Sequence, residues 1–241
     1  MRERTESLPK ALVEVGGKPL LWHVISIYAQ QGFTEFHPLT GYLGEMVDQF
    51  ASNEDWPEGV SVSCLDTGLD TPTGGRIEMA GGVAGDGTFC ATYADGVADI
   101  DLDALLDFHA DQGSAATMTA VRPNLQWGVA DIDDDQRVRG FTEKPRSQHW
   151  INGGFFCFEQ SIFERLAVDS VLEREPLESL AREGALSAYR HEGFWDCMDT
   201  YKDLVELNDL WDSGQAPWLS QGPSEPGTGT LTADDSRRAA L

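Results

Sequence analysis

Apolar side chains recur at helical spacing in the first well-patterned segment of the chain. Within residues 19–31 they occupy positions 20, 21, 24, 25 and 28, a spacing that gathers them on one face of a helix. Pro19 suits the first helical position, and Gly32 suits a stop. The pattern predicts a helix between these two residues.

A second helix is predicted between Asp101 and Gly113. Asp101 can cap its N-terminus, and Gly113 can end it in a left-handed conformation. Apolar residues and a histidine at 102, 105, 106 and 109 share one face. Further helices are expected at 161–167, 176–184 and about 200–211.

Between the helices, alternating or continuous apolar runs predict strands. These runs lie at 59–66, 88–93, 115–123 and 150–159, with a hairpin at 128–141 that turns at 133–136 and a strand-like stretch ending at Met198. In segment 33–42 a strand is expected, but His37-Pro38 argues against a central position because proline cannot donate to the ladder. Strands alternating with helices predict an α/β domain with a largely parallel sheet.

The composition divides the chain into two parts. A length of 241 residues with 41% hydrophobic side chains suits one large domain, which we place at 1–219. From about Ser220 the sequence is rich in Gly, Pro, Ser and Thr. Such a segment buries too little apolar surface to offset its ordering entropy, so 220–241 is predicted to be a disordered tail.

The charge balance excludes several classes of function. Asp and Glu total 41 against 17 Lys and Arg, a formal net charge of −24. Binding to nucleic acid or to an anionic membrane surface requires the opposite field. No apolar run approaches the roughly 18 residues of a membrane span, and the N-terminus lacks the apolar core of a secretory signal. We therefore expect a cytoplasmic protein.

The cysteines and lysines are both few. Four cysteines without a C-x-x-C pair indicate reduced thiols rather than a disulfide framework or a zinc site. The lysines are Lys10, Lys18, Lys144 and Lys202. An acidic, lysine-poor surface fits a protein that works in high salt, where repulsion is screened, or an ordinary acidic cytosolic protein. Either way, each lysine is of interest in so lysine-poor a chain, because lysine is a compact point charge suited to phosphate.

Two glycine-containing segments could bind anions. Residues 9–19 hold two lysines and a Gly-Gly, without the spacing of a Walker A loop. Residues 66–82 form a glycine-rich loop that leads into a helix beginning near Arg76, where backbone N–H groups could meet a phosphate. Each segment alone is also consistent with a simple turn.

Carboxylates and a third lysine lie at element ends. Asp95 follows a predicted strand, where ligands bind in open α/β sheets and where Mg²⁺ takes oxygen ligands; an Asp-Gly turn is the alternative. Asp199 precedes the last helix, where it could serve as an N-cap. Lys144 stands before a proline, a few residues ahead of Asn152-Gly153-Gly154.

The order of these segments resembles the sugar-1-phosphate nucleotidyltransferases, and among them the glucose-1-phosphate cytidylyltransferases. The resemblance covers about residues 2–218 and rests on PKALVEVGGKPLLWH, TGGRI, YADG, FTEKP, INGGFF and FWDCMDTYKDL in that order. It implies a Rossmann-like nucleotidyltransferase fold with a mixed, mostly parallel sheet flanked by helices. It also implies cytidylyl transfer from CTP to glucose 1-phosphate, giving CDP-glucose and pyrophosphate, and a homo-oligomer.

The resemblance also implies roles for individual residues. Asp95 and Asp199 would hold Mg²⁺ between the α-phosphate and the leaving pyrophosphate, Lys10 would contact the phosphates, and Lys144 would contact the sugar phosphate. The remaining implied binding residues are Asn152 and Gly153 against the sugar, Gly74, Gly75 and Arg76 along the nucleoside and phosphates, and Tyr93 beside the metal aspartate.

The sequence departs from the family pattern at its start. The family opens with a strand and an A-G-G-x-G-T-R loop that supplies a catalytic arginine, and Met1 aligns with the residue after that arginine. We therefore expect either a start assigned too late or a true truncation. A truncated chain would expose strand edges next to the missing strand and would be unstable and inactive.

Two further departures concern specificity. Ala94 replaces the glycine that usually precedes the metal aspartate, and the stretch between Phe50 and Val60 is short. Thymidylyl or uridylyl transfer therefore stays open beside cytidylyl transfer. The sequence is also consistent with a non-catalytic relative that binds sugar phosphate, or with a damaged product without function.

Overall fold

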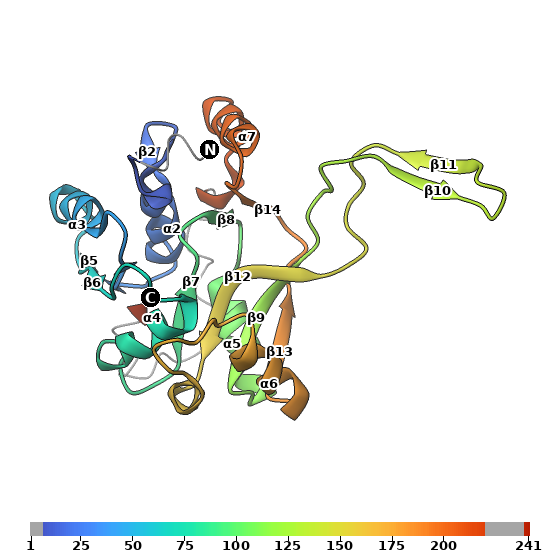
Figure 1. Cartoon of the computed structure of the whole chain (residues 1–241). Coiled ribbons are helices and arrows are strands. Elements are labelled where there is room, and N and C mark those ends of the chain that lie inside the picture. The colour runs from blue at the N-terminus through green and yellow to red at the C-terminus, as the bar shows by residue number, and fades with distance from the viewer. Residues whose placement is uncertain (1–6, 220–238) are drawn as a thin grey trace, which may run out of the picture.

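A seven-stranded sheet runs through the middle of the molecule (Figure 1). The structure is a computed structural model that describes residues 7–219 and 239–241. In spatial order the strands are β13 (Leu186–Arg190), β9 (Ala116–Val121), β12 (Ile151–Phe158), β7 (Phe89–Thr92), β15 (Ala239–Ala240), β3 (Glu35–Phe36) and β5 (Ser61–Val62). Only β12 is antiparallel to its neighbours. The sheet is therefore mixed and mostly parallel, as predicted.

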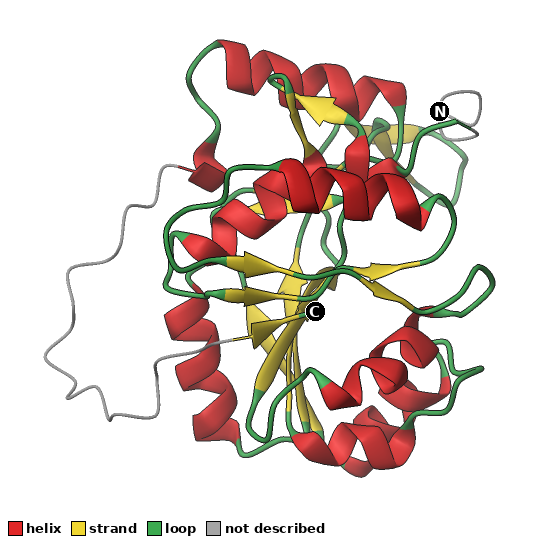
Figure 2. Cartoon of the chain, turned by 90° about the vertical axis from the view of Figure 1, so that its left-hand side faces the viewer, coloured by secondary structure: helices red, strands yellow, loops and turns green. Residues whose placement is uncertain are grey.

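Helices lie on both sides of the strands (Figure 2). The α-helices are α2 (Leu20–Ala29), α3 (Gly44–Asn53), α4 (Thr73–Met79), α5 (Leu102–Gln112), α6 (Glu175–Glu183) and α7 (Tyr201–Asp212). Short 3₁₀ helices are η1 (Lys10–Leu12), η2 (Ala80–Gly82), η3 (Gln160–Arg165) and η4 (Pro217–Leu219). The predicted caps of α5 are confirmed, because the Asp101 side chain accepts from Ala104 N and Gly113 is left-handed. The segment predicted as a helix at 161–167 forms 3₁₀ turns instead.

Strand β12 separates two apolar clusters. Successive side chains of a strand point to opposite faces; accordingly Phe155 and Cys157 belong to one cluster, whereas Phe156 and Phe158 belong to the other. All four are buried. The strand is covered on both faces, which explains why its sequence is a continuous apolar run rather than an alternating one.

The break at His37-Pro38 divides the predicted second strand. Before it, β3 pairs with β5 in the central sheet; after it, β4 (Leu39–Thr40) pairs with β6 (Leu65–Asp66) in a separate two-stranded sheet. The expected interruption is thus confirmed, and the single strand predicted at 59–66 is likewise two short strands. Residues 37–42, which include β4, line the cavity of the candidate site described below.

The last residues of the chain lie within the sheet. Strand β15 runs parallel between β7 and β3, with hydrogen bonds from His37 N to Ala240 O (2.9 Å) and from Leu241 N to Cys90 O (3.0 Å). The C-terminus accordingly lies among the strands in Figure 2. Residues 220–238 of the predicted disordered tail lie outside the described residues, but the prediction is wrong for the final residues. Strand β15 thus pairs with one edge of β7 and one edge of β3.

Besides β4 with β6, the described residues form three small two-stranded sheets. They are β1 (Glu14–Val15) with β2 (Lys18–Pro19), β8 (Gly96–Ala98) with β14 (Trp195–Cys197), and the predicted hairpin of β10 (Val129–Ile132) with β11 (Val138–Thr142). The hairpin projects from the body (Figure 1). Among the described residues, no helix combines the length and apolar character needed to cross a membrane. The four cysteines, Cys64, Cys90, Cys157 and Cys197, are free thiols in the structure.

Candidate functional site

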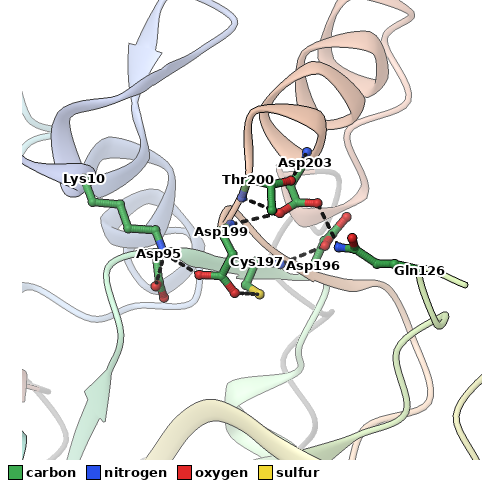
Figure 3. A network of polar contacts seen from close by, with 8 residues as sticks. All are labelled: Lys10, Asp95, Gln126, Asp196, Cys197, Asp199, Thr200 and Asp203. Atoms are coloured by element: carbon green, nitrogen blue, oxygen red, sulfur yellow. Dashed lines mark hydrogen bonds and ion pairs between the residues drawn. The ribbon is translucent and has the colours of Figure 1, made fainter. Parts of the chain in front are cut away.

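Three charged side chains from distant parts of the sequence converge at one point. The ammonium nitrogen of Lys10 lies 2.7 Å from Asp95 Oδ2 and 2.7 Å from Asp199 Oδ1. Figure 3 shows the three side chains directed toward one another, from η1, from the end of β7 and from the start of α7. All three were predicted as site residues, and the fold brings them together.

Local structure fixes the two carboxylates. Asp95 lies in the turn between β7 and β8, and its carbonyl accepts a hydrogen bond from Met198 N (2.9 Å), which ties it to the β14 segment. Asp199 is not the N-cap of α7, although its position before the helix allowed that role. Thr200 is the cap, in a capping box with Asp203. The Asp199 side chain is therefore available to face Lys10.

Asp203 anchors the segment that carries Asp199. Its buried carboxylate accepts from Asp199 N (3.0 Å) and Thr200 N (2.7 Å), and Gln126 donates to it at 3.3 Å. Sequence reasoning missed this residue, although a Thr followed three residues later by an acid is a capping-box pattern that could have identified it. Asp203 therefore holds the backbone of Asp199 in place through the hydrogen bond from Asp199 N.

The cluster also shifts the pKa values of its members. Partial burial alone would lower the pKa of Lys10, but hydrogen bonds to Asp199 and Asp95 outweigh it and raise that pKa. The hydrogen bond from Lys10 lowers the pKa of Asp199. Burial raises the pKa of Asp196 to about 6 and raises that of Cys197, whose thiol donates to Asp199 (3.3 Å). These two shifts favour the charged forms of Lys10 and Asp199 at neutral pH.

The two carboxylates have the chemistry and placement of a cation site. The Lys10 ammonium shows that Asp95 and Asp199 can direct one oxygen each at the same positive centre. Carboxylate oxygens are the ligands Mg²⁺ prefers, and one or two of them with substrate phosphates make a common site. The residues present thus fit the predicted metal, with Lys10 at the place where the two carboxylates meet.

A cavity of about 610 Å³ opens beside this cluster. Apolar side chains of α2 and β3 line much of it, and its charged members are Lys10, Arg76 and Asp95. Its size is that of a small-molecule site. Tyr93 also lines it, so four of the predicted site residues share one cavity.

Arg76 and the glycines before it have structural contacts of their own. The Arg76 guanidinium donates to Thr40 O (2.7 Å) and so joins α4 to the end of β4. A Cβ atom on Gly75 would lie 1.9 Å from Val168 O, and one on Gly74 would lie 2.9 Å from Ser170. Gly74 and Gly75 do not line the cavity. Close packing accounts for both glycines, and their contact with substrate stays a prediction.

The Asn-Gly-Gly segment supports Tyr93. Asn152 donates to the Tyr93 hydroxyl (3.3 Å) and accepts from Gly154 N (2.9 Å). Gly154 has φ +80°, and a Cβ atom there would lie 2.6 Å from the Tyr93 ring. Burial, and then a hydrogen bond to Glu173, raise the pKa of Tyr93. The contacts of Gly154 and Glu173 with Tyr93 were not predicted from the sequence. For Gly154 the available signal was the second glycine after Asn152.

Other predicted residues lie outside the cavity wall. Asn152 and Gly153 are on β12, where a Cβ atom on Gly153 would lie 2.9 Å from Val121. Lys144 is exposed in the segment that returns from the hairpin and has φ +47°. Neither Lys144 nor Gly153 lines the cavity beside Lys10. Their roles toward a sugar phosphate therefore stay predictions.

Comparison with known proteins places this chain in a family. The family model described as nucleotidyl transferase matches residues 2–216. A probable glucose-1-phosphate cytidylyltransferase of Bacillus subtilis is 40% identical over 239 residues, which cover 90% of this chain and 94% of the relative. The glucose-1-phosphate cytidylyltransferase of Salmonella typhi is 39% identical over 245 residues, covering 90% and 93% respectively.

The fold itself also has solved counterparts. A putative glucose-1-phosphate thymidylyltransferase from Bacillus anthracis, solved in complex with sucrose, superposes with a TM-score of 0.66 at 18% identity. The match covers 93% of this chain and 92% of that one. At this identity the similarity concerns the fold, and it confirms the predicted α/β nucleotidyltransferase architecture.

Proposed function

This chain belongs to the nucleotidyl transferase family as a sugar-1-phosphate nucleotidyltransferase, and we propose that it transfers a cytidylyl group from CTP to glucose 1-phosphate. The observation that carries the proposal is the convergence of Lys10, Asp95 and Asp199 beside a cavity. The choice of CTP and glucose 1-phosphate rests on the two cytidylyltransferase relatives, at 40% and 39% identity.

The reaction itself is a displacement at phosphorus. A phosphate oxygen of glucose 1-phosphate forms a bond to the α-phosphorus of CTP, and the bond from that phosphorus to the oxygen of pyrophosphate breaks. Such transfers depend on positioning and on stabilisation of charge more than on covalent help from the protein. Few groups are therefore required of this chain.

The residues of the site supply those two functions. Asp95 and Asp199 would hold Mg²⁺, which when bound neutralises charge on the phosphate oxygens. Lys10 adds a compact positive charge for phosphate once a metal or substrate draws it away from the carboxylates. Asp203 holds the Asp199 backbone in place. Positive charge from Lys10 and a bound Mg²⁺ would explain how a chain of net charge −24 can bind anionic substrates.

A nucleotide panel tests the proposal. Glucose 1-phosphate, Mg²⁺ and each of CTP, dTTP and UTP are incubated with a form that carries, before Met1, the strand and A-G-G-x-G-T-R loop that the family resemblance implies. The sugar nucleotide is then separated by chromatography. CDP-glucose is the expected main product. A preference for dTTP or UTP would contradict the base assignment while leaving the reaction class intact.

A second arm of the experiment separates catalysis from binding alone. The assay is repeated on the 241-residue chain as printed. Calorimetry measures glucose 1-phosphate binding by both forms. Binding by both without turnover by either would support a non-catalytic relative and contradict the enzymatic proposal.

A further inference from the structure

A carboxylate outside the Lys10 cluster lies at the edge of the same cavity. Thr73, Tyr93 and Leu172 line that cavity, and Glu173 follows Leu172 in the chain. One oxygen of the Glu173 carboxylate accepts a hydrogen bond from the Thr73 hydroxyl (2.7 Å), and the other accepts one from the Tyr93 hydroxyl. The carboxylate therefore lies against two side chains of the cavity wall.

The loop that carries Glu173 is held against helix α4. Gly75 N donates to Ser170 O (3.0 Å), and Leu172 N donates to the Thr73 hydroxyl oxygen (3.0 Å). Thr73 thus accepts from the loop backbone and donates to the carboxylate of the next residue in the loop. These bonds fix the carboxylate before any ligand binds, which reduces the ordering that binding would otherwise require.

The second hydroxyl donor is held by the central sheet. Asn152 of β12 donates to the Tyr93 hydroxyl oxygen (3.3 Å), and the Tyr93 ring meets that of Phe156 edge-on, with the ring centres 5.7 Å apart. Burial, and then the hydrogen bond to Glu173, raise the pKa of Tyr93. The hydroxyl therefore keeps its proton and remains a donor.

Glu173 has acceptor capacity that these two hydroxyls do not use. Its side chain is exposed. Within the described part of the chain, no lysine, arginine or histidine lies within ion-pair distance of it. An ionised carboxylate offers about four acceptor positions, so about two remain for a ligand in the cavity.

The chemistry of the open acceptor positions indicates which part of a substrate they can bind. A carboxylate repels phosphate and only accepts hydrogen bonds, so it suits an uncharged donor. Two oxygens on one group match two hydroxyls on neighbouring carbon atoms, and the Thr73 and Tyr93 contacts show one hydroxyl at each oxygen. Such pairs occur on the hexose of glucose 1-phosphate and on the ribose of CTP.

We propose that Glu173 binds two neighbouring sugar hydroxyls of the substrate and thereby determines which sugar the site accepts. The inference rests on the proposed function, which supplies the two candidate sugars. Glu173 takes no part in the transfer at phosphorus. A site that hydrogen-bonds a hydroxyl rejects an analogue without it, because the acceptor is then left unpaired.

Calorimetric titration of the 241-residue chain tests the inference. The ligands are glucose 1-phosphate with its 2-, 3- and 4-deoxy analogues, and CTP with its 2′- and 3′-deoxy analogues. Wild type should bind an analogue that lacks a recognised hydroxyl about 10–100-fold more weakly than the parent, the usual effect of one hydrogen bond to a charged group. Glu173→Ala should bind the parent more weakly and lose most of that difference.

Two further variants separate recognition from support of the fold. Glu178→Ala, the matched control, removes an exposed glutamate of α6 that does not line the cavity, and it should keep wild-type affinities. Tyr93→Phe removes one donor to Glu173 but leaves the carboxylate, so the discrimination against the deoxy analogue should persist. Circular dichroism checks that each variant is folded.

The pattern of affinities decides the outcome. Discrimination that disappears in Glu173→Ala supports the inference, and the series in which it disappears identifies the sugar as the hexose or the ribose. Equal weakening of parent and analogues in Glu173→Ala, or no measurable binding of either parent, would overturn it. The reaction is tested separately: discrimination without turnover would leave this inference standing without the proposed function, and CDP-glucose formation with equal weakening would do the reverse.

Discussion

At the scale of single residues, the site and its surroundings depend on how charged side chains are paired or buried and on close packing at a glycine. Lys10 satisfies two carboxylates that would otherwise repel each other across a small gap. Asp196, behind them, lies in a poorly solvated position that favours its neutral form. Gly75 allows α4 to approach the 168–172 loop closely. The environments of Asp196 and Gly75 can each be tested by substitution.

Asp196 should make stability depend on pH. Its folded pKa is raised to about 6 from an ordinary 3.8, so the folded chain binds the proton more tightly than the unfolded chain. Its contribution therefore stabilises the fold below pH 4 and is lost as pH rises through 6. Asp196→Asn, which keeps an acceptor for Cys197 N, should raise the melting temperature above pH 6 and lose that advantage near pH 4.

Melting curves of wild type and Asp196→Asn across pH 4–8 provide the measurement. The nearby charges are Asp203, Glu206 and Lys202, and all three are unchanged in the variant. A difference in melting temperature that stays constant over this range would show that Asp196 titrates normally.

Gly75 should be intolerant of any side chain. A methyl group there would lie 1.9 Å from Val168 O, so Gly75→Ala should destabilise the fold by about 1–3 kcal/mol, the usual cost of overpacking. Gly82→Ala is the matched control, because nothing lies within 4 Å of its Cβ position. Urea unfolding of both variants measures the difference, and equal stabilities would contradict the packing role.

At the scale of elements, helix α7 determines the position of Asp199. The capping box joins Thr200 to Asp203, and the same Asp203 carboxylate binds Asp199 N. The sequence could predict the helix and the nearby aspartate, because both follow from local pattern. The spacing of Thr200 and Asp203 was the local signal for the cap, since it matches a capping box. The contact of Asp199 with Lys10 is tertiary, so local pattern could not predict it.

Thr200→Ala tests this arrangement. Loss of the cap should cost about 1 kcal/mol and should weaken Mg²⁺ binding as Asp199 becomes less ordered. Thr200→Ser retains the hydroxyl and should restore both properties. Thermal melts and calorimetric Mg²⁺ titration provide the readouts, and an alanine variant with unchanged Mg²⁺ affinity would separate the cap from the site.

The strand predictions show the same division between local and tertiary information. The strands at 88–93, 115–123 and 150–159 were predictable, because a continuous apolar run bounded by turn residues is typical of a buried strand. The fragments β3 to β6 were harder, since each pairs over two residues and depends on neighbours far along the chain. Cavity lining was harder still, and Gly74 and Gly75 illustrate that a glycine-rich motif can reflect packing instead.

At the scale of the whole molecule, strand β15 links two parts of the sheet. It lies between β7 and β3, and the described residues give those two strands no direct pairing. The composition of the last residues could not predict this role, because two alanines and a leucine carry little strand signal by themselves. Residues 239–240 form a strand because β7 and β3, on either side, offer backbone groups to pair with.

A buried charge in that slot should release the strand. Ala240 is buried, so Ala240→Asp should lower the melting temperature by several degrees and speed amide exchange at His37, which bonds Ala240 O. Ala188→Asp is the matched control, on the exposed side of β13. Similar melting and exchange in both variants would show that β15 contributes little to the fold.

The whole molecule brings Lys10, Asp95 and Asp199 together, and we propose that CDP-glucose is made at this centre. The decisive quantity is the rate of CDP-glucose formation from CTP and glucose 1-phosphate in Asp95→Asn, Asp199→Asn and Asp212→Asn. We expect losses of about 10²–10³-fold in the first two, typical for removal of one charge-stabilising group, and an unchanged rate in Asp212→Asn, an exposed residue of α7. Near-normal rates with either Asp95→Asn or Asp199→Asn would contradict the proposal.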